Sequence, residues 1–371
     1  MPKAKPMARQ PREPAKIIRL RRQLLEWYAR SRRDLPWRRN PDPYSIWVSE
    51  IMLQQTRVAV VVERYQTFLA RFPTLDSLEQ ASEQDVLALW SGLGYYRRAR
   101  MLHKAAKLVV HQLEGSLPTN AEALRTLPGI GAYTAAAIAS IAHGEVVAVV
   151  DGNVERVLCR LEGWAAGGRA GETALKHKIE DLAAQLVDPA HPGDFNQALM
   201  ELGATVCLPR NPMCLVCPVA AGCKTQGEHK TTPRPRMQSR EVAHALCVRR
   251  GRRPNRSGRE VLLEQRAASL TVMPGLWELP TLKHTAVPAK ELIMTVRHAI
   301  MQVNYYVRIR TVQEDEVETM TIAAGERRWV PLNEAVVMAL TGLARKVLTR
   351  ARLLAATPRA AIAPKPGSDV L

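Results

Sequence analysis

The chain has 371 residues, enough for about two domains of ordinary size. Its 53 Lys and Arg residues exceed its 35 Asp and Glu residues, and the resulting net charge of +18 favours a polyanionic partner such as nucleic acid. Hydrophobic residues make up 46% of the chain and charged residues 24%, which excludes wholesale disorder. No stretch is apolar for the ~20 residues that a membrane helix needs. The basic N-terminus lacks the apolar core of a secretory signal, so we expect a cytoplasmic location, associated with the nucleoid if bacterial. We also expect a monomer.

The first two thirds of the chain are predicted to be helical. Residues 1–16 form a basic, proline-containing tail that we expect to be disordered. From residue 17 to residue 224, apolar residues recur at spacings of three and four, which indicates an all-α domain. Asp42 precedes Pro43 and is predicted to cap a helix that begins at the proline.

That helix carries Glu50 among apolar neighbours. Burial among them would raise the pKa of the carboxyl and suit it to donate a proton. A glutamate that reaches solvent at the rim of a helix is the commoner arrangement, and the sequence of this segment alone favours it.

Gly94, Tyr95 and Tyr96 are followed by three arginines, at positions 97, 98 and 100. Aromatic rings can insert between DNA bases while arginines neutralise phosphates. A core aromatic residue beside a solvated basic face explains the same pattern equally well.

Residues 127–131 read Leu-Pro-Gly-Ile-Gly between two helical stretches. Two glycines allow a tight turn that leaves backbone N–H groups at the start of the next helix, where they could bind a DNA phosphate. A plain helix–helix turn with glycine caps has equal weight. Asp151 opens another helix about twenty residues later, and its position by itself indicates an N-cap rather than a catalytic group.

Four of the six cysteines lie close together, at positions 207, 214, 217 and 223. Four thiolates in so short a loop predict one metal centre, either a tetrahedral zinc or an iron–sulfur cluster. Their C-x6-C-x2-C-x5-C spacing does not decide between these metals. The other two, Cys159 and Cys247, are spaced as core residues.

The composition changes after the cysteines. Residues 225–240 are rich in proline and arginine and predict a linker. Beyond it the apolar period approaches two, which predicts a smaller α+β domain over 241–356. We expect strands at 242–248, 261–265, 303–312 and 328–331, a turn-rich connection at 251–258, a helix at 333–354, and a disordered tail at 357–371.

Taken together, these motifs resemble the helix-hairpin-helix base-excision glycosylases, and within them the MutY-type adenine DNA glycosylases. The resemblance runs from about residue 35 to residue 223, through LPWR, WVSEIMLQQT, GLGYYRRARML, LPGIGAYTAAAIAS, VDGNVERVL and FNQALMELGA. It implies a multidomain protein, with an all-α helix-hairpin-helix glycosylase domain over 17–224. This domain would include an iron–sulfur loop at 207–223, where Cys207, Cys214, Cys217 and Cys223 hold a 4Fe–4S cluster. A smaller α+β Nudix-like domain would follow.

The resemblance also implies roles for individual residues. Glu50 would be the general acid that protonates the adenine leaving group, and Asp151 would stabilise the positive sugar that forms as the bond breaks. Tyr133 and Asn153 fall where the family supports the aspartate and the sugar. The implied contacts with DNA are made by Arg38, Gln54, Gln55, Tyr95, Leu127, Gly129 and Gly131.

The implied substrate is double-stranded DNA in which adenine is mispaired with 8-oxoguanine or guanine. The implied reaction is hydrolysis of the N-glycosidic bond of that adenine in base excision repair, after the base has left the stack. The endonuclease III branch carries a lysine where this chain has Tyr133, so we expect a monofunctional glycosylase without Schiff-base lyase chemistry. Two alternatives are an endonuclease III-like glycosylase/lyase that acts on oxidised pyrimidines and a non-catalytic mismatch-binding protein.

Residues 275–280 and 296–298 resemble the Nudix-like module with which this family senses 8-oxoguanine. Between Pro280 and Ile300 the sole acidic residue is Glu291, so the carboxylate cluster that holds Mg²⁺ in Nudix pyrophosphatases is absent. We therefore expect a reader of the lesion rather than a hydrolase. The Phe-Ser-His lesion-reading tip of the family aligns with Ile300, Met301 and Gln302, and residues 283–297 are short for the module's first helix.

Overall fold

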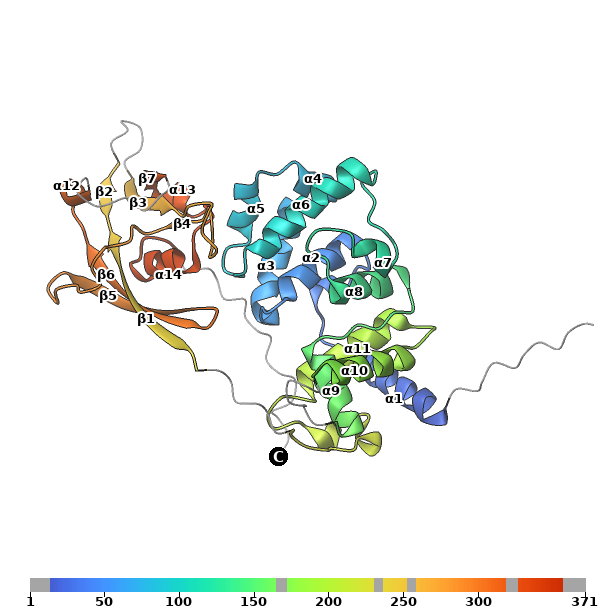
Figure 1. The fold of residues 1–371 in the computed structure, drawn as a ribbon. Coiled ribbons are helices and arrows are strands. Elements are labelled where there is room, and N and C mark those ends of the chain that lie inside the picture. Colours follow the sequence, from blue (N-terminus) through green and yellow to red (C-terminus); the bar gives the residue numbers. More distant parts are fainter. Residues whose placement is uncertain (1–13, 165–171, 230–235, 252–257, 318–325, 356–371) are drawn as a thin grey trace, which may run out of the picture. The chain divides into compact units, whose positions relative to one another are not determined.

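The structure is a computed structural model, and it describes residues 14–164, 172–229, 236–251, 258–317 and 326–355 (Figure 1). The chain divides into two compact units, each made of two separate stretches: residues 1–50 with 117–232, and residues 51–116 with 233–371. The tails expected to be disordered lie almost wholly outside the described residues, as does most of the expected turn at 251–258. No helix within the described ranges is both long and apolar enough to cross a membrane.

Within the described residues 17–164 and 172–224, the expected helical organisation is confirmed. Asp42 precedes the helix that begins at Pro43, and its carboxylate accepts a hydrogen bond from the Ser45 N–H (2.8 Å), as expected of an N-cap. The first unit contains α1 (Ala15–Ser31), η1 (Pro36–Arg38), most of α2 (Pro43–Leu53), α7 (Ala121–Leu124), α8 (Ala132–His143), α9 (Gly152–Glu162), α10 (Glu172–Leu186), α11 (Pro192–Thr205), η2 (Cys214–Val216) and η3 (Ala220–Gly222).

One hydrophobic core joins four of these helices. Leu24 of α1, Leu158 of α9, Ile179 of α10 and Phe195 of α11 are all buried in it. A smaller cluster between α8 and the extended segment before α9 includes Ala137 and Val149, with Tyr133 and Met200 packed against it. These two cores fix the ends of α8, α9 and α11, which carry most of the candidate site.

The second unit begins with helices and ends with strands. Its helices before residue 117 are α3 (Val58–Arg71), α4 (Leu75–Glu79), α5 (Glu83–Leu89) and α6 (Arg97–Gln112). The later elements are β1 (Gln238–Leu246), β2 (Val248–Arg250), β3 (Arg259–Gln265), β4 (Trp277–Glu278), β5 (Leu292–Ile300), β6 (Val303–Thr311), α12 (Glu314–Val317), β7 (Arg327–Pro331), α13 (Leu332–Ala335) and α14 (Gly342–Arg350).

The strands form two sheets, of order β1-β6-β5 and β2-β3-β4, with β7 paired to β3 in the second. Strand β1 runs parallel to β6, and the other pairs are antiparallel. Val307 of the first sheet, Leu263 of the second and Val347 of α14 are fully buried in one shared core. The expected sheet-containing C-terminal domain is therefore confirmed.

Three details of this domain differ from the sequence prediction. Strand β1 begins at Gln238, inside the expected linker. Strand β5 was not expected, because Val296 is its one buried residue and apolar alternation along it is weak. The single helix predicted over 333–354 is wrong: α13 ends at Ala335 and α14 begins at Gly342, where Thr341 caps the new helix by accepting from the Ala344 N–H (3.1 Å).

The helical and sheet parts of the second unit contact each other at the start of α6. The Tyr96 hydroxyl donates to the Leu340 carbonyl (3.1 Å), and the Arg345 guanidinium donates to the Ser91 hydroxyl (2.8 Å). All of these side chains lie in the stretches that make up this unit.

Candidate active site

Glu50 is buried in the last turns of α2, with 5% of its surface exposed. The alternative that it reaches solvent is therefore wrong. The Tyr133 hydroxyl, in the first turn of α8, donates a hydrogen bond to Glu50 Oε2 (2.6 Å). Burial raises the pKa of Glu50 to about 7; the negative charge of Asp151 adds to the rise, while the Tyr133 hydrogen bond and the positive charge of Arg38 oppose it. Glu50 is thus a carboxyl that can hold or release a proton near neutral pH.

Tyr133 stays protonated beside this carboxyl. Burial and the negative charges of Glu50 and Asp151 raise the pKa of its phenol well above its ordinary value. The hydroxyl also lies 3.5 Å from the Met200 sulfur. The resemblance suggested that Tyr133 supports the aspartate, but its hydrogen bond goes to Glu50 instead.

Asp151 is the N-cap of α9, as its sequence position indicates. Its Oδ1 accepts hydrogen bonds from the backbone N–H groups of Asn153 (2.9 Å) and Val154 (2.7 Å). Its Oδ2 accepts from the Asn153 side-chain amide (2.9 Å). These three donors hold the carboxylate in one orientation at the start of α9. The aspartate is therefore a fixed negative charge whose field reaches Glu50.

The close packing of α11 against α9 holds this aspartate in place. A Cβ at Gly203 of α11 would lie 2.6 Å from the Asn153 Cβ and 3.0 Å from its carbonyl oxygen. No residue larger than glycine fits there without displacing the start of α9. The glycine in α11 thus sets the position of Asp151 and Asn153.

The expected hairpin lies directly before Tyr133. Gly129 adopts a φ of +80°, a conformation that favours glycine, and Gly131 is the N-cap of α8. Leu127 and Ile130 are buried and anchor the turn. Gly131 has no side chain to cap the helix, so the first N–H groups of α8 are available to an anion.

Arg38 is held inside the first unit. Its guanidinium donates to Glu201 Oε2 (2.8 Å) and to the Arg33 carbonyl (3.1 Å), and 11% of the side chain is exposed. Arg33 donates to the same carboxylate through Nε and Nη2, both at 2.7 Å. Burial alone would raise the pKa of Glu201, but the hydrogen bonds from the two arginines outweigh it and lower this pKa to about 2.

The other residues expected to contact DNA lie in the second unit. Gln54 and Gln55 follow the end of α2, and Tyr95 precedes α6. Gln55 is exposed, Gln54 is half-buried, and 49% of Tyr95 is exposed. Gln55 (φ 54°) and Tyr95 (φ 47°) both adopt the left-handed conformation that is uncommon for residues other than glycine.

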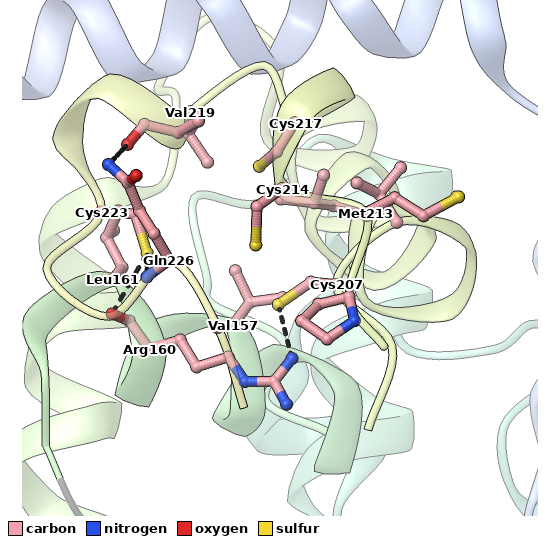
Figure 2. A pocket seen from close by; sticks show the side chains of 15 residues that line it. Val157, Arg160, Leu161, Cys207, Met213, Cys214, Cys217, Val219, Cys223 and Gln226 are labelled. Atoms are coloured by element: carbon pink, nitrogen blue, oxygen red, sulfur yellow. Dashed lines mark hydrogen bonds between the residues drawn. The ribbon is translucent and has the colours of Figure 1, made fainter. Parts of the chain in front are cut away.

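The four clustered cysteines line one pocket with Arg160 of α9, as Figure 2 shows. Arg160 donates to the Cys207 sulfur (3.4 Å), and the Cys223 thiol donates to the Arg160 carbonyl (3.3 Å). Burial raises the pKa of Cys217 to about 11, and negative charge on the other three cysteines adds to the rise. Among the described side chains, no group of three or more His, Cys, Asp or Glu residues is arranged to hold a metal ion. Cys159 and Cys247 are buried, as expected of core residues.

Sequence comparison identifies the family to which this arrangement belongs. The sequence model of the HhH-GPD superfamily of base excision DNA repair proteins matches residues 48–185, which include Glu50, Tyr133 and Asp151. The solved structure of a thermostable thymine-DNA glycosylase is 30% identical, covers 57% of this chain and 96% of its own, and superposes with a TM-score of 0.51. The chain belongs to the HhH-GPD superfamily.

Within this superfamily the chain is similar to adenine DNA glycosylases. It is 41% identical over 345 residues to the human enzyme, a match that covers 78% of this chain and 61% of the human protein. It is 52% identical over 219 residues to the rat enzyme, which covers 57% of this chain and 42% of the rat protein. The chain thus spans about half the length of the curated relatives that it matches.

The structure of this HhH-GPD chain adds two residues that the sequence did not single out as functional. Glu201 lies 163 residues from Arg38, and nothing in a single sequence pairs them. Arg156 of α9 donates to the Asn153 side chain (2.9 Å), the Gly203 carbonyl (2.7 Å) and the Cys207 carbonyl (2.8 Å). It therefore connects the aspartate's neighbour to the cysteine loop. An arginine one turn into a helix gives no sign of this role.

Proposed function

We propose that this protein is a monofunctional DNA glycosylase that acts as a monomer on duplex DNA. It hydrolyses the N-glycosidic bond of adenine mispaired with 8-oxoguanine, or with guanine, in base excision repair. The observation that carries the proposal is the buried Glu50. Its pKa is raised to about 7 by burial and, to a smaller extent, by the negative charge of Asp151. An acid that is half protonated near neutral pH beside a fixed carboxylate suits cleavage of a bond between a sugar and a base.

Glu50 is the proton donor in this mechanism. The bond from the sugar C1′ to adenine N9 breaks, and its electron pair leaves with the base. The proton of Glu50 goes to adenine N7, so the base departs without a full negative charge. The Tyr133 hydrogen bond then stabilises the Glu50 carboxylate that remains. Water adds to C1′ and returns a proton to Glu50, which completes hydrolysis.

Asp151 stabilises the positive sugar between these two steps. The hydrogen bonds that it accepts from Asn153 and Val154 hold the carboxylate in place, so its charge needs no reorganisation as the sugar becomes positive. Tyr133 stands where the endonuclease III branch has an amine, and a phenol forms no Schiff base. The reaction therefore ends at an abasic site with both strands intact.

Residues of each unit are assigned separately to contacts with the DNA. Leu127, Gly129 and Gly131 form a turn that offers the first N–H groups of α8 to a phosphate. Most of the Arg38 side chain is covered and its positive charge acts on Glu50, so we assign it to the extruded nucleotide rather than to the outer backbone. The turns that carry Gln54, Gln55 and Tyr95 are assigned to the space that the extruded base leaves.

We propose that the four cysteines, which line one pocket, hold a 4Fe–4S cluster through their thiolates. Cys207, Cys214, Cys217 and Cys223 surround one pocket, and the Arg160 guanidinium that donates to Cys207 would offset part of their charge (Figure 2). When bound, the cluster would cross-link this loop and supply a one-electron redox centre. Purified protein should be coloured and contain about four irons per chain. Colourless protein that contains zinc instead would contradict this assignment.

We further propose that the sheet-containing domain is Nudix-like and reads the base opposite the adenine. Residues 275–280 include β4, and Val296 to His298 lie on β5. Met301 lies in the turn between β5 and β6, at the tip of their hairpin, and 73% of its surface is exposed. An exposed apolar tip is suited to contact with an unstacked base.

The proposal is tested by incubating the protein with duplexes that carry adenine opposite 8-oxoguanine, guanine, cytosine or thymine and chromatographing the released bases. Free adenine from the first two duplexes, with strands intact until treated with alkali, is the expected result. Release of oxidised pyrimidines with a borohydride-trapped adduct would favour a glycosylase/lyase. Tight binding without release of any base would favour a mismatch-binding protein.

A further inference from the structure

The two turns that we assign to the space left by the extruded base have the same kind of backbone strain. Gln55 and Tyr95 are the exposed residues at their tips, and both have a positive φ. A residue other than glycine in this conformation costs about 1 kcal/mol, so neighbouring groups must hold it there. The second unit supplies one side chain that reaches both turns.

That side chain is Arg98, in the first turn of α6. Its Nη1 donates to three carbonyls at the end of α2, and its Nη2 donates to three acceptors in or near the second turn. The acceptors of Nη1 are the carbonyls of Ile51 (2.7 Å), Met52 (3.0 Å) and Gln54 (2.5 Å). The acceptors of Nη2 are the Thr56 hydroxyl (3.0 Å) and the carbonyls of Leu93 (3.1 Å) and Gly94 (3.2 Å).

The first group of acceptors lies at the end of α2, where the last carbonyls of a helix have no N–H of the same helix to accept from. Helix α2 ends at Leu53, and the guanidinium caps it in place of the next turn of helix. The chain can therefore turn sharply at Gln55. Thr56 strengthens the link, because its hydroxyl also lies 3.2 Å from the Leu93 carbonyl, which it can reach as a donor.

Arg98 also contacts the aromatic side chain that it positions. Its guanidinium carbon lies 5.5 Å from the centre of the Tyr95 ring and 5.6 Å from that of Trp90. Trp90 is fully buried, and its indole N–H donates to the Gly94 carbonyl (3.2 Å). The ring of Tyr95 is thus set against a cation that buried groups hold still.

These contacts exclude the role that the sequence suggested for this arginine. A guanidinium has five N–H donors, and both Nη atoms of Arg98 already serve internal acceptors. Burial lowers the pKa of Arg98 to about 10, so it keeps its charge at neutral pH. Its neighbour Arg97 is exposed at the first residue of α6 and remains suited to a phosphate.

We infer that Arg98 is a positioning residue that locks the Gln55 and Tyr95 turns together, so that both tips enter the DNA as one rigid wedge. The inference rests on the proposed function, because it assumes that the two turns fill the gap beside an extruded adenine. Arg98 acts through these turns and does not touch the reacting atoms. A lysine keeps its charge but offers donors from a single nitrogen, so it cannot span both turns.

The test compares Arg98→Lys with Arg97→Ala and with Arg71→Lys, a matched exchange at an exposed arginine of α3. Each full-length variant is bound to a duplex in which 2-aminopurine replaces the mispaired adenine, and its fluorescence reports unstacking. Single-turnover adenine release and the salt dependence of binding are measured alongside, with thermal melting and iron content as checks of folding.

For Arg98→Lys we expect a loss of roughly 10- to 100-fold in the release rate and a weaker unstacking signal, with the salt dependence unchanged. Arg97→Ala should instead make the salt dependence of binding shallower, with the magnitude of the slope of log K against log salt smaller by about one. Arg71→Lys should match the parent protein. A parent-like release rate in Arg98→Lys, or a salt slope that falls as in Arg97→Ala, would overturn the inference.

Two further variants keep the test decisive if Arg98→Lys folds poorly. Thr56→Val removes one acceptor that serves both turns and should weaken unstacking in the same direction. In a Tyr95→Ala background, Arg98→Lys should reduce the rate of adenine release by a much smaller factor than it does alone. A reduction by the same factor in both backgrounds would contradict positioning through Tyr95. If the parent protein releases no adenine at all, the proposed function fails, while unstacking and salt dependence still report on Arg98.

Discussion

Replacing Glu50 with a glutamine should make the protein more stable at alkaline pH. Burial raises the pKa of Glu50 from 4.5 to about 7. Between these values the folded chain holds a proton that the unfolded chain has lost, so unfolding releases it. The free energy of unfolding therefore falls as the pH rises from about 4.5 to about 7. The amide of the variant side chain could not ionise and would escape this loss.

The size of the effect follows from the two pKa values. They differ by about 2.5, and each pH unit that separates them is worth ~1.4 kcal/mol, which gives ~3 kcal/mol. At pH 8 Glu50→Gln should exceed the parent protein in free energy of unfolding by about this amount. Below pH 4.5 both side chains are neutral in both states, and the difference should approach zero.

Urea unfolding followed by circular dichroism at pH 4.5, 6, 7 and 8 measures this difference. Glu122→Gln, at an exposed position of α7, is the control and should show no comparable gain at high pH. The reasoning is refuted if Glu50→Gln changes stability by the same amount at every pH, or if it destabilises the protein at pH 8.

Three other substitutions test residues that support Glu50 and Asp151. Tyr133→Phe removes a hydrogen bond that favours ionised Glu50, so the alkaline limb of the single-turnover pH–rate profile should move up by about one pH unit. Gly203→Ala should lower the free energy of unfolding by about 1–3 kcal/mol and slow adenine release, because the new methyl overlaps Asn153. Glu201→Gln leaves two arginines without their counter-charge and should cost about 3 kcal/mol in denaturant unfolding at pH 7.

Each of these has a control or a contrary outcome. Gly152→Ala, at the start of α9 where a Cβ meets open space, should leave the melting temperature nearly unchanged. The cost of Glu201→Gln should shrink as the pH falls from 4.5 towards 2, because the parent carboxylate is protonated there. A downward move of the alkaline limb in Tyr133→Phe would contradict the assigned direction of its hydrogen bond.

Much of the fold could be predicted from local signals in the sequence. The three- and four-residue period indicated the helices, and Asp42 and Asp151 were identified as N-caps by the residues that follow them. Prediction failed over residues 333–354. The Thr341 cap is a local sign of the break between α13 and α14, and the isolated bridge between Leu340 and Trp277 places the residues between the two helices against β4.

The candidate site, like the fold, could be predicted from the sequence only in part. Apolar neighbours indicated a raised pKa for Glu50, but burial, which needs the whole fold, had to exclude the solvent-exposed alternative. The partners of Arg98 are mostly backbone carbonyls, which every residue has, so no sequence pattern distinguishes it from Arg97. Glu201 is recognisable as a partner of Arg38 once α11 and η1 are placed together.

The most direct test of the account is single-turnover release of adenine by the parent protein and by Glu50→Gln at pH 7, on a duplex with adenine opposite 8-oxoguanine. We predict free adenine and intact strands with the parent protein, and no measurable release with Glu50→Gln although it folds and binds the duplex. Release at the parent rate by Glu50→Gln, or no adenine from the parent protein, would contradict the account.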